Sequence, residues 1–295
     1  IEAKLAAGPS PPSTLKVAVL ETPDPGPKAF VDALVGTLHF NGGKSVAQNG
    51  SAFTVEMTED ASKQAVNYIA HADALAAFQP DVVVIAMGAE FPIHYLQLLE
   101  AKWTTSKPKP YYVMTTLNFE ASPFATVIGA GDDDVRKRLS GTRPGYDATL
   151  QANIDAFTIH YKTTYNFKAP DGNYSGYDAF YATAYAMIAA TNGITLDGPH
   201  VSAGFERLRN GTTIDFRPNQ IGLGLALLGS AANEINVRGL TSGLDWNVTT
   251  HDITVPDLGI YCLARSGDGS IVIQPDTGPR MQTNSGTVTG TYTCD

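Results

Sequence analysis

The sequence predicts an α/β protein in which a doubly wound parallel sheet is followed by a helix-rich region. The first observation is that short runs rich in Val and Ile alternate with amphipathic stretches from Leu15 to about residue 145. This is the order of buried parallel strands and their crossover helices. The second observation is that the sequence after residue 145 contains helical patterns with hardly a strand between them.

Four apolar runs are predicted to be the strands of the parallel sheet: 15–20 (LKVAVL), 53–57 (FTVEM), 81–88 (DVVVIAMG) and 110–116 (PYYVMTT). Runs without polar alternation suit strands that are covered on both faces, and the stretches between them suit right-handed crossover helices. Pro80 and Pro110 stop the preceding segments and mark where strands begin. The helices are predicted at 27–43, 62–78 and 91–103.

The sequence pattern of the helix-rich region predicts four helices, at 147–166, 172–191, 202–211 and 220–234. Strand-like sequence returns only near the C-terminus, at 235–247, 258–275 and 286–295. No internal repeat with a fixed period is visible. The helices of this region carry large apolar faces without a sheet of their own.

A row of tyrosines occupies the segment 172–191, GNYSGYDAFYATAYAMIAAT. Spacings of three, four and four residues place Tyr174, Tyr177, Tyr181 and Tyr185 on one side of a helix. A second row beside them consists of Phe180, Ala184 and Ile188. Two adjacent apolar rows predict a helix that is buried nearly all round. Tyr174 lies in the Gly-Asn-Tyr-Ser-Gly loop and Tyr177 directly follows it, so either a core position or a ligand contact fits them.

Composition excludes several classes of protein. The chain has 295 residues, of which 43% are apolar and 17% charged, and this describes a globular protein with a sizeable core. Its longest apolar stretches are far too short to span a bilayer. The net charge of −9 comes without any cluster of Lys and Arg, so we expect no nucleic-acid partner.

The two cysteines, Cys262 and Cys294, lack the spacing of a metal-binding knuckle. A disulfide that joins the C-terminal tail to a strand is favoured over two free thiols. Such a bond predicts an oxidising compartment, the periplasm or the cell exterior.

No catalytic, metal or cofactor motif is recognisable by its spacing. The six histidines are scattered singly, and Ser175 in GNYSG stands one place too late for a nucleophile elbow. The acidic run GDDD at 131–134, followed by VRKRL, is interpreted as a helix with acids at its start and bases at its end. No glycine-rich phosphate loop follows a strand. We therefore expect no catalysis, no metal and no cofactor.

Six segments, in this order along the chain, resemble the type 1 periplasmic solute-binding proteins of ABC transporters, the branched-chain amino acid (Leu/Ile/Val) binding class. They are KVAVLETPDPGPKAF (16–30), QPDVVVIAMGAEFPIHYLQLLEA (79–101), KPYYVMTTLNFEA (109–121), GYDAFYATAYAMIAA (176–190), GLTSGLDWN (239–247) and LGIYCLARSGDG (258–269). The resemblance implies two α/β lobes that close on a small ligand. It also implies a periplasmic or extracellular location and an ABC permease as membrane partner.

Under this resemblance, residues 14–145 form the family's second lobe, 146–245 a helix-rich part of the first lobe, and 246–295 the return to the α/β lobe and the tail. Only fourteen residues precede the first strand, which matches the start of lobe two. We therefore expect a missing first-lobe segment, upstream or in a separate chain, to cover the apolar faces of the helices. These faces include Phe180, Tyr181, Ala184, Tyr185 and Ile188 in one helix and Leu223, Leu225, Leu227 and Leu228 in another.

Ligands of open parallel sheets bind beyond the carboxyl ends of the strands, so the loops after the strands hold the candidate residues. In the matching loops of this family an aromatic or polar contact and an acidic partner for a ligand ammonium are expected. The candidates are Pro25, Gly26, Gly88, Ala89, Glu90, Asn118, Glu120, Tyr174 and Tyr177. The loop at Pro25 also fits an ordinary turn, and Glu90 also fits a first-turn carboxylate that favours the helix dipole. Glu120 lacks the family's usual Gly-Pro-Glu context.

The leading function is capture of a small polar solute, an amino acid or a similar compound, for ABC-type uptake. A ligand-sensing receptor ectodomain on the same scaffold is the alternative, and an α/β hydrolase is a weaker one. A fold alone does not decide among them.

Overall fold

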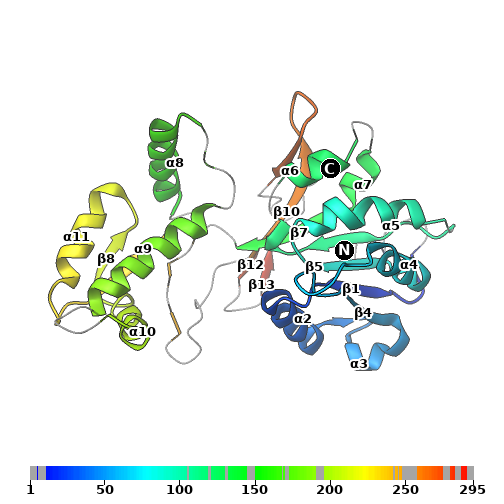
Figure 1. Ribbon diagram of the computed structural model, residues 1–295, viewed down its shortest axis with the longest axis horizontal. Helices are drawn as coiled ribbons and strands as arrows, with labels where there is room; N and C mark the ends of the chain where they lie inside the picture. Colours follow the sequence, from blue (N-terminus) through cyan, green and yellow to red (C-terminus); the bar gives the residue numbers. More distant parts are fainter. Residues whose placement is uncertain are drawn as a thin grey trace. The chain divides into compact units, whose positions relative to one another are not determined.

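The computed structural model describes residues 5, 11–104, 106–118, 121–129, 132–144, 150–167, 169, 173–190, 196–241, 243–244, 246–247, 258–274, 280–282 and 287–290. The chain folds into two compact units (Figure 1). Unit 1 contains Ile1–Arg143, Ile260–Thr277 and Tyr292–Asp295, and unit 2 contains Pro144–Gly259 and Gly278–Thr291. The chain thus returns to unit 1 after unit 2.

Unit 1 is built on a parallel sheet with strand order β4-β1-β5-β6-β7-β10. The first five in this order are β4 (Phe53–Met57), β1 (Val17–Glu21), β5 (Val82–Ala86), β6 (Tyr111–Met114) and β7 (Leu139–Pro144). The pairs from β4 to β7 are parallel, and β10 (Leu258–Arg265) pairs antiparallel with β11 (Ile271–Gln274). The four predicted strands and the α/β class are confirmed. The sequence did not predict β7, because Gly141, Arg143 and Pro144 interrupt its apolar pattern.

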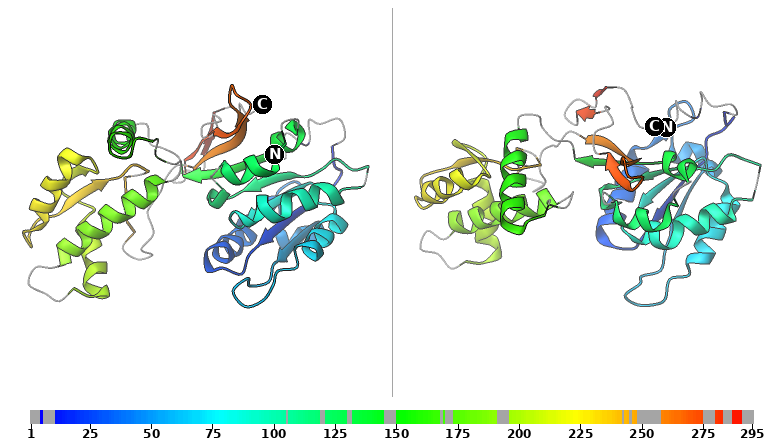
Figure 2. Two further views of the ribbon diagram at one scale, coloured as in Figure 1. Left: turned by 45° about the horizontal axis from the view of Figure 1, so that its top comes forward. Right: turned by 90° about the horizontal axis from the view of Figure 1, so that it is seen from above.

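Helices cover both faces of this sheet (Figure 2). Alternate residues of β1 enter different apolar clusters: Ala18 and Leu20 pack in one, and Val17 and Val19 in the other. The first cluster lies under α4 (Tyr68–Phe78), the π-helical turn η2 (Phe91–Leu96), α5 (Gln97–Lys102) and α6 (Ser122–Val127). The second lies under α2 (Pro25–Thr37) and the short elements β2 (His39–Phe40), β3 (Lys44–Ser45), α3 (Val46–Asn49) and η1 (Gly50–Ala52).

The predicted helix at 62–78 begins only at Tyr68. The Asp60 carboxylate accepts hydrogen bonds from the backbone N–H of Ser62 at 2.9 Å and from its hydroxyl at 2.6 Å, which fixes a turn at this point. The Asn67 side chain then caps the helix by accepting a bond from the Ala70 N–H. Residues 61–66 therefore form a loop.

The acidic run at 131–134 begins a short helix, as interpreted from the sequence. Helix α7 (Asp133–Lys137) has acids in its first turn and bases in its last. Asp133 pairs with Arg136 and with Arg265 of β10, at 3.0 and 2.9 Å. These carboxylates thus stabilise the helix and its contact with β10.

The described part of unit 2 contains a small sheet and four helices. They are α8 (Gln151–Tyr165), α9 (Asn173–Ala190), α10 (Gly198–Glu206) and α11 (Pro218–Leu228). Strands β8 (Thr212–Asp215) and β9 (Ile235–Arg238) pair in parallel. The sequence did not predict β8, because its four residues show no clear apolar alternation. Two further strands, β12 (Arg280–Gln282) and β13 (Thr287–Thr289), pair antiparallel with each other.

Helix α9 is buried on one side only, which corrects the predicted all-round burial. Tyr185 is fully buried and donates its hydroxyl to the Ile221 carbonyl at 3.0 Å. In contrast, 66% of Phe180 is exposed, and so is 51% of Leu223 on α11. The small sheet β8–β9 covers the Tyr185 side of α9 and leaves the Phe180 side to the solvent in this chain.

Cys262 is buried on β10, and no free cysteine occurs among the described residues. Cys294 lies outside the described residues, so its pairing with Cys262 stays a prediction.

Candidate functional site

A pocket of about 470 Å³ lies at the carboxyl ends of β1, β4 and β5 in unit 1. These strands are parallel neighbours, so the loops that follow them meet at one edge of the sheet. The loop after β1 supplies residues 22–25, and the loop after β4 supplies residues 58–63. The remaining lining residues are Val66, Tyr68, Glu90 and Tyr95.

Four carboxylates line this pocket: Asp24, Glu59, Asp60 and Glu90. Lys63 is the one lysine among the described lining residues. Its ammonium lies 2.8 Å from Asp60, and the hydrogen bonds from Lys63 and Ser62 lower the pKa of Asp60 to about 2. Glu90 makes no ion pair with any described residue. The pocket therefore carries an excess of negative charge at neutral pH.

His71 lies beneath the pocket between two carboxylates. Its Nδ1 is 2.6 Å from Glu56 and its Nε2 is 2.7 Å from Glu59. Both contacts require an N–H, so the ring is an imidazolium when both are made. Burial by itself would lower the pKa of His71, but the hydrogen bonds to Glu56 and Glu59 raise it above its usual value. His71 thereby fixes the position of the Glu59 side chain at the pocket wall.

We predict a pH-dependent loss of stability from this arrangement. A histidine whose folded pKa is raised stabilises the fold fully below its unfolded pKa, about 6.5, and this contribution is lost as pH rises through the folded pKa. The free energy of unfolding from urea titrations should fall from pH 6 to pH 9 by more in the wild type than in His71→Gln. Equal pH dependence in the two proteins would contradict the assignment.

Tyr95 lines the pocket and has a buried, unpaired hydroxyl. The residue is only 1% exposed, and its Oη has no hydrogen-bond partner. Its ring packs edge-on against Tyr68 at 5.2 Å, and Tyr68 stacks on His94 at 4.4 Å. Burial raises the pKa of Tyr95, so the group is a neutral phenol. A buried hydroxyl without a partner is costly, and such a group at a pocket wall indicates a ligand contact.

Glu21, the last residue of β1, is a second buried polar group at this edge. It is 3% exposed, and its Oε2 has no partner. Burial raises the pKa of Glu21, an effect that the charge of Lys28 partly offsets. Two unsatisfied groups at the same edge of the sheet are unusual for a purely structural region.

The structure brings two of the predicted site residues, Pro25 and Glu90, into this pocket. Gly88 lies two residues before Glu90 in the chain. A Cβ added at Gly88 would meet Glu90 Oε2 at 3.2 Å. Ala89 separates these two residues, and Gly26 lies in the first turn of α2. The place of Gly26 and Ala89 in ligand binding stays a prediction.

Asn118 lies in the 3-10 turn η3 (Thr116–Asn118), which follows β6. It is 3% exposed and donates Nδ2 to the Met87 carbonyl at 2.7 Å, while its Oδ1 has no partner. It therefore joins the ends of β5 and β6. The predicted acidic contact Glu120 lies outside the described residues.

Tyr174 and Tyr177 belong to unit 2, where both contact the ring of Phe157, at 5.6 and 4.8 Å. Tyr177 also donates its hydroxyl to the Phe216 carbonyl at 3.3 Å. Within unit 2 these rings join α9 to α8. A ligand contact by either residue stays a prediction.

The sequence did not predict three residues that line the pocket: Glu59, Tyr68 and Tyr95. Tyr68 and Tyr95 fell within predicted amphipathic helices, where aromatic residues indicate a core. The loop after β4 was hidden by the predicted helix at 62–78. The Asp-x-Ser turn at Asp60 and Ser62 was the available signal for this loop.

No protein-family model matches the sequence, and no curated protein sequence matches it. Solved structures do match its fold. One is a leucine-binding protein from Thermotoga maritima, with 12% identity, a TM-score of 0.55, and coverage of 98% of this chain and 64% of that chain. A solute-binding protein of an ABC transporter from Rhodopseudomonas palustris, in complex with 3,4-dihydroxybenzoic acid, has 14% identity, a TM-score of 0.52, and coverage of 88% and 58%.

A substrate-binding periplasmic protein from Ralstonia solanacearum has 13% identity, a TM-score of 0.52, and coverage of 89% of this chain and 62% of that chain. These likenesses establish the fold, that of the type 1 periplasmic binding proteins. The chain spans less than two thirds of the length of these neighbours.

Within the described residues, no group of three or more His, Cys, Asp or Glu side chains is arranged to hold a metal ion. No helix in the described part of the chain has the length and apolar content that a membrane crossing requires.

Proposed function

We propose that this protein binds a small polar solute outside the cytoplasm and that the ligand is an amino acid or a similar compound with a cationic group. The observation that carries the proposal is the unpaired Tyr95 hydroxyl in a negatively charged pocket at the carboxyl edge of the sheet. The fold supports it, because the structural neighbours are binding proteins rather than enzymes. We also propose that the bound solute is taken up through an ABC permease in the membrane.

The cationic group follows from the charges of the pocket. Asp60 is compensated by Lys63 and Glu59 by His71, whereas Glu90 has no cationic partner among the described residues. A ligand ammonium would supply that partner and form a charge-assisted hydrogen bond. The neutral Tyr95 hydroxyl would bind a second polar atom of the same ligand. The rings of Tyr68 and Tyr95 provide the apolar wall.

A thermal-shift panel tests the proposal. It contains the amino acids, their N-acetyl derivatives, and small carboxylic acids without an amine. A ligand at about a hundred times its Kd stabilises the folded state by roughly 2.7 kcal/mol. We expect a raised Tm with at least one free amino acid and none with its N-acetyl derivative, which lacks the cation. Stabilisation by the carboxylic acids alone would contradict a cationic ligand.

Two variants test where the ligand from that panel binds, with the affinity of each variant measured by titration calorimetry. Glu90→Gln should weaken binding about 10- to 100-fold, the usual worth of a hydrogen bond to a charged group. Tyr95→Phe should weaken it about three- to tenfold and should also raise the Tm of the ligand-free protein, because an unsatisfied buried hydroxyl is removed.

The matched controls are Glu206→Gln on α10 and Tyr165→Phe on α8, both exposed and both in unit 2. They should leave the affinity unchanged. If the controls weaken binding as much as the pocket variants do, the pocket is not the site.

A receptor ectodomain that senses the same ligand is the second candidate function. It is favoured by a neighbour from Verminephrobacter eiseniae that is described as an extracellular ligand-binding receptor. The pocket chemistry is the same in both cases. The predicted Cys262–Cys294 disulfide is proposed with either function, because both act in an oxidising compartment.

A further inference from the structure

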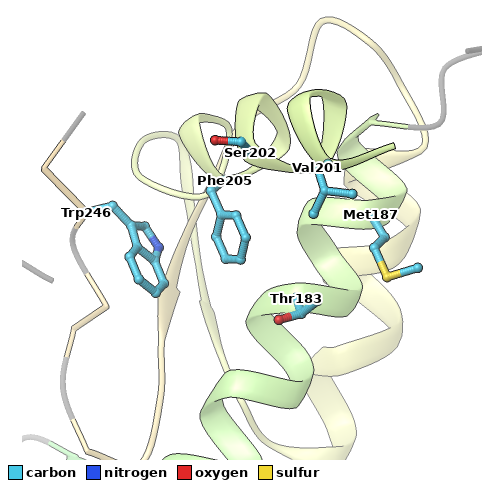
Figure 3. Close-up of a pocket in the computed structure, with 7 residues that line it drawn as sticks. Thr183, Met187, Val201, Ser202, Phe205 and Trp246 are labelled. Carbon is cyan, nitrogen blue, oxygen red and sulfur yellow. The ribbon is translucent and has the colours of Figure 1, made fainter. Parts of the chain in front are cut away.

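A second pocket, of about 510 Å³, lies wholly in unit 2 and is unlike the acidic pocket of unit 1 (Figure 3). Thr183 and Met187 on α9 form one wall, and Val201, Ser202 and Phe205 on α10 form the second. Trp246 closes a third side. None of the described residues that line it is charged. A pocket of this size with apolar walls suits a small organic ligand.

Trp246 carries an unpartnered polar group in the lining of this pocket. Its indole Nε1 is buried and has no hydrogen-bond partner. Its ring meets Phe205 edge-on, with centroids 5.0 Å apart and planes at 66°. Figure 3 shows the nitrogen-bearing edge of the indole turned toward Phe205. An aromatic face is only a weak acceptor, so a better acceptor can take the indole N–H when the Phe205 ring turns aside.

The two helices that form two walls of the pocket are held at close range. Gly204 of α10 packs directly on the backbone of α9, where an added Cβ would lie 2.1 Å from the Ala186 carbonyl oxygen. The opposite side of α9 carries the buried Tyr185. The backbones of α9 and α10 therefore do not depend on the ligand for their position.

We infer that this pocket binds a neutral, ring-sized apolar molecule with one hydrogen-bond acceptor, which receives the Trp246 indole N–H. The hydroxyls of Thr183 and Ser202 offer weaker polar contacts at the lining. An anionic analogue is disfavoured, because burying a carboxylate without a cation costs free energy. This ligand differs in class from the cationic solute proposed for unit 1.

The experiment uses acetophenone as the probe and the two indole N–H signals of the ¹⁵N-labelled protein as the reporter. The chain has two tryptophans, and Trp103 already donates its Nε1 to the Lys107 carbonyl in unit 1. Trp103→Phe assigns the signals. We expect acetophenone to shift the Trp246 signal to a plateau and to leave the Trp103 signal in place. Benzoate should bind at least about tenfold more weakly.

Variants whose larger side chains fill the pocket provide a second test of the inference. Val201→Phe and Met187→Phe should each abolish the shift, and circular dichroism identifies the variant that keeps its helices. Ala203→Phe, at an exposed position of the same helix outside the lining, should retain it. The inference is overturned if the Trp246 signal does not move up to the solubility limit of acetophenone, if benzoate binds equally well, or if the folded filled variants still respond.

Discussion

Glu100→Ala should lower the free energy of unfolding by about 3–5 kcal/mol, the cost of leaving one buried charge without its partner. The Arg138 guanidinium, 7% exposed, makes a two-bond contact with Glu100 at 2.9 and 2.7 Å. Tyr112 and Lys109 donate to the same carboxylate at 2.8 and 2.9 Å. The cluster joins α5 to the start of β7 and to β6. Urea titration at pH 7 measures the loss.

Asp134→Ala is the matched control, because Asp134 also pairs with Arg138, at 3.0 Å, but its side chain is 79% exposed. We expect it to cost less than about 1 kcal/mol. Burial alone would raise the pKa of Glu100, but Arg138 lowers it below 4.5. The contribution of Glu100 is thus present above pH 4.5 and lost as pH falls through its folded pKa. Similar losses for Glu100→Ala and Asp134→Ala would refute this account.

Gly204→Ala should destabilise unit 2 by about 3 kcal/mol, the upper end of the usual cost of overpacking, because the added methyl group cannot be accommodated between α9 and α10. Its Cβ would lie 2.1 Å from the Ala186 carbonyl oxygen, a backbone atom that cannot rotate away. The helices would have to separate, and the pocket between them would open. Calorimetric unfolding, with tryptophan fluorescence for Trp246, reports the change.

Gly222→Ala is the control for this effect. Gly222 lies in α11, and a Cβ added there meets nothing within 4 Å. Replacing glycine by alanine in a helix interior stabilises it by roughly 0.5–1 kcal/mol. The two identical substitutions should therefore have opposite signs. A Gly204→Ala protein as stable as the wild type would show that α9 and α10 are not in close contact.

The parallel sheet of unit 1 could be predicted from the sequence because its strands are continuous apolar runs, as in Val82–Ala86, where every residue is buried. Strands β7 and β8 could not, because one contains Gly and Pro and the other has two exposed threonines. In α9 the tyrosine spacing located the buried Tyr185 but not the exposed Phe180. Apolar identity alone does not tell which face of a helix meets a partner.

Part of the candidate site could also be predicted from the sequence. The rule that ligands bind beyond strand ends located Pro25 and Glu90, which do line one pocket. It did not locate Tyr95, because a tyrosine in a helix resembles a core residue and its missing hydrogen bond is visible only in three dimensions. His71 was assigned no role as a single histidine, yet the fold places it between Glu56 and Glu59.

Hydrogen exchange with and without the stabilising amino acid tests the proposed site most directly. If the acidic pocket of unit 1 is the binding site, the amides of Thr22 and Asp24 in one loop and those of the loop at 58–63 should exchange more slowly in the presence of ligand. The Glu90→Gln protein at the same ligand concentration should lose this protection. Protection that is absent from both loops while the ligand is bound would contradict the assignment of the pocket.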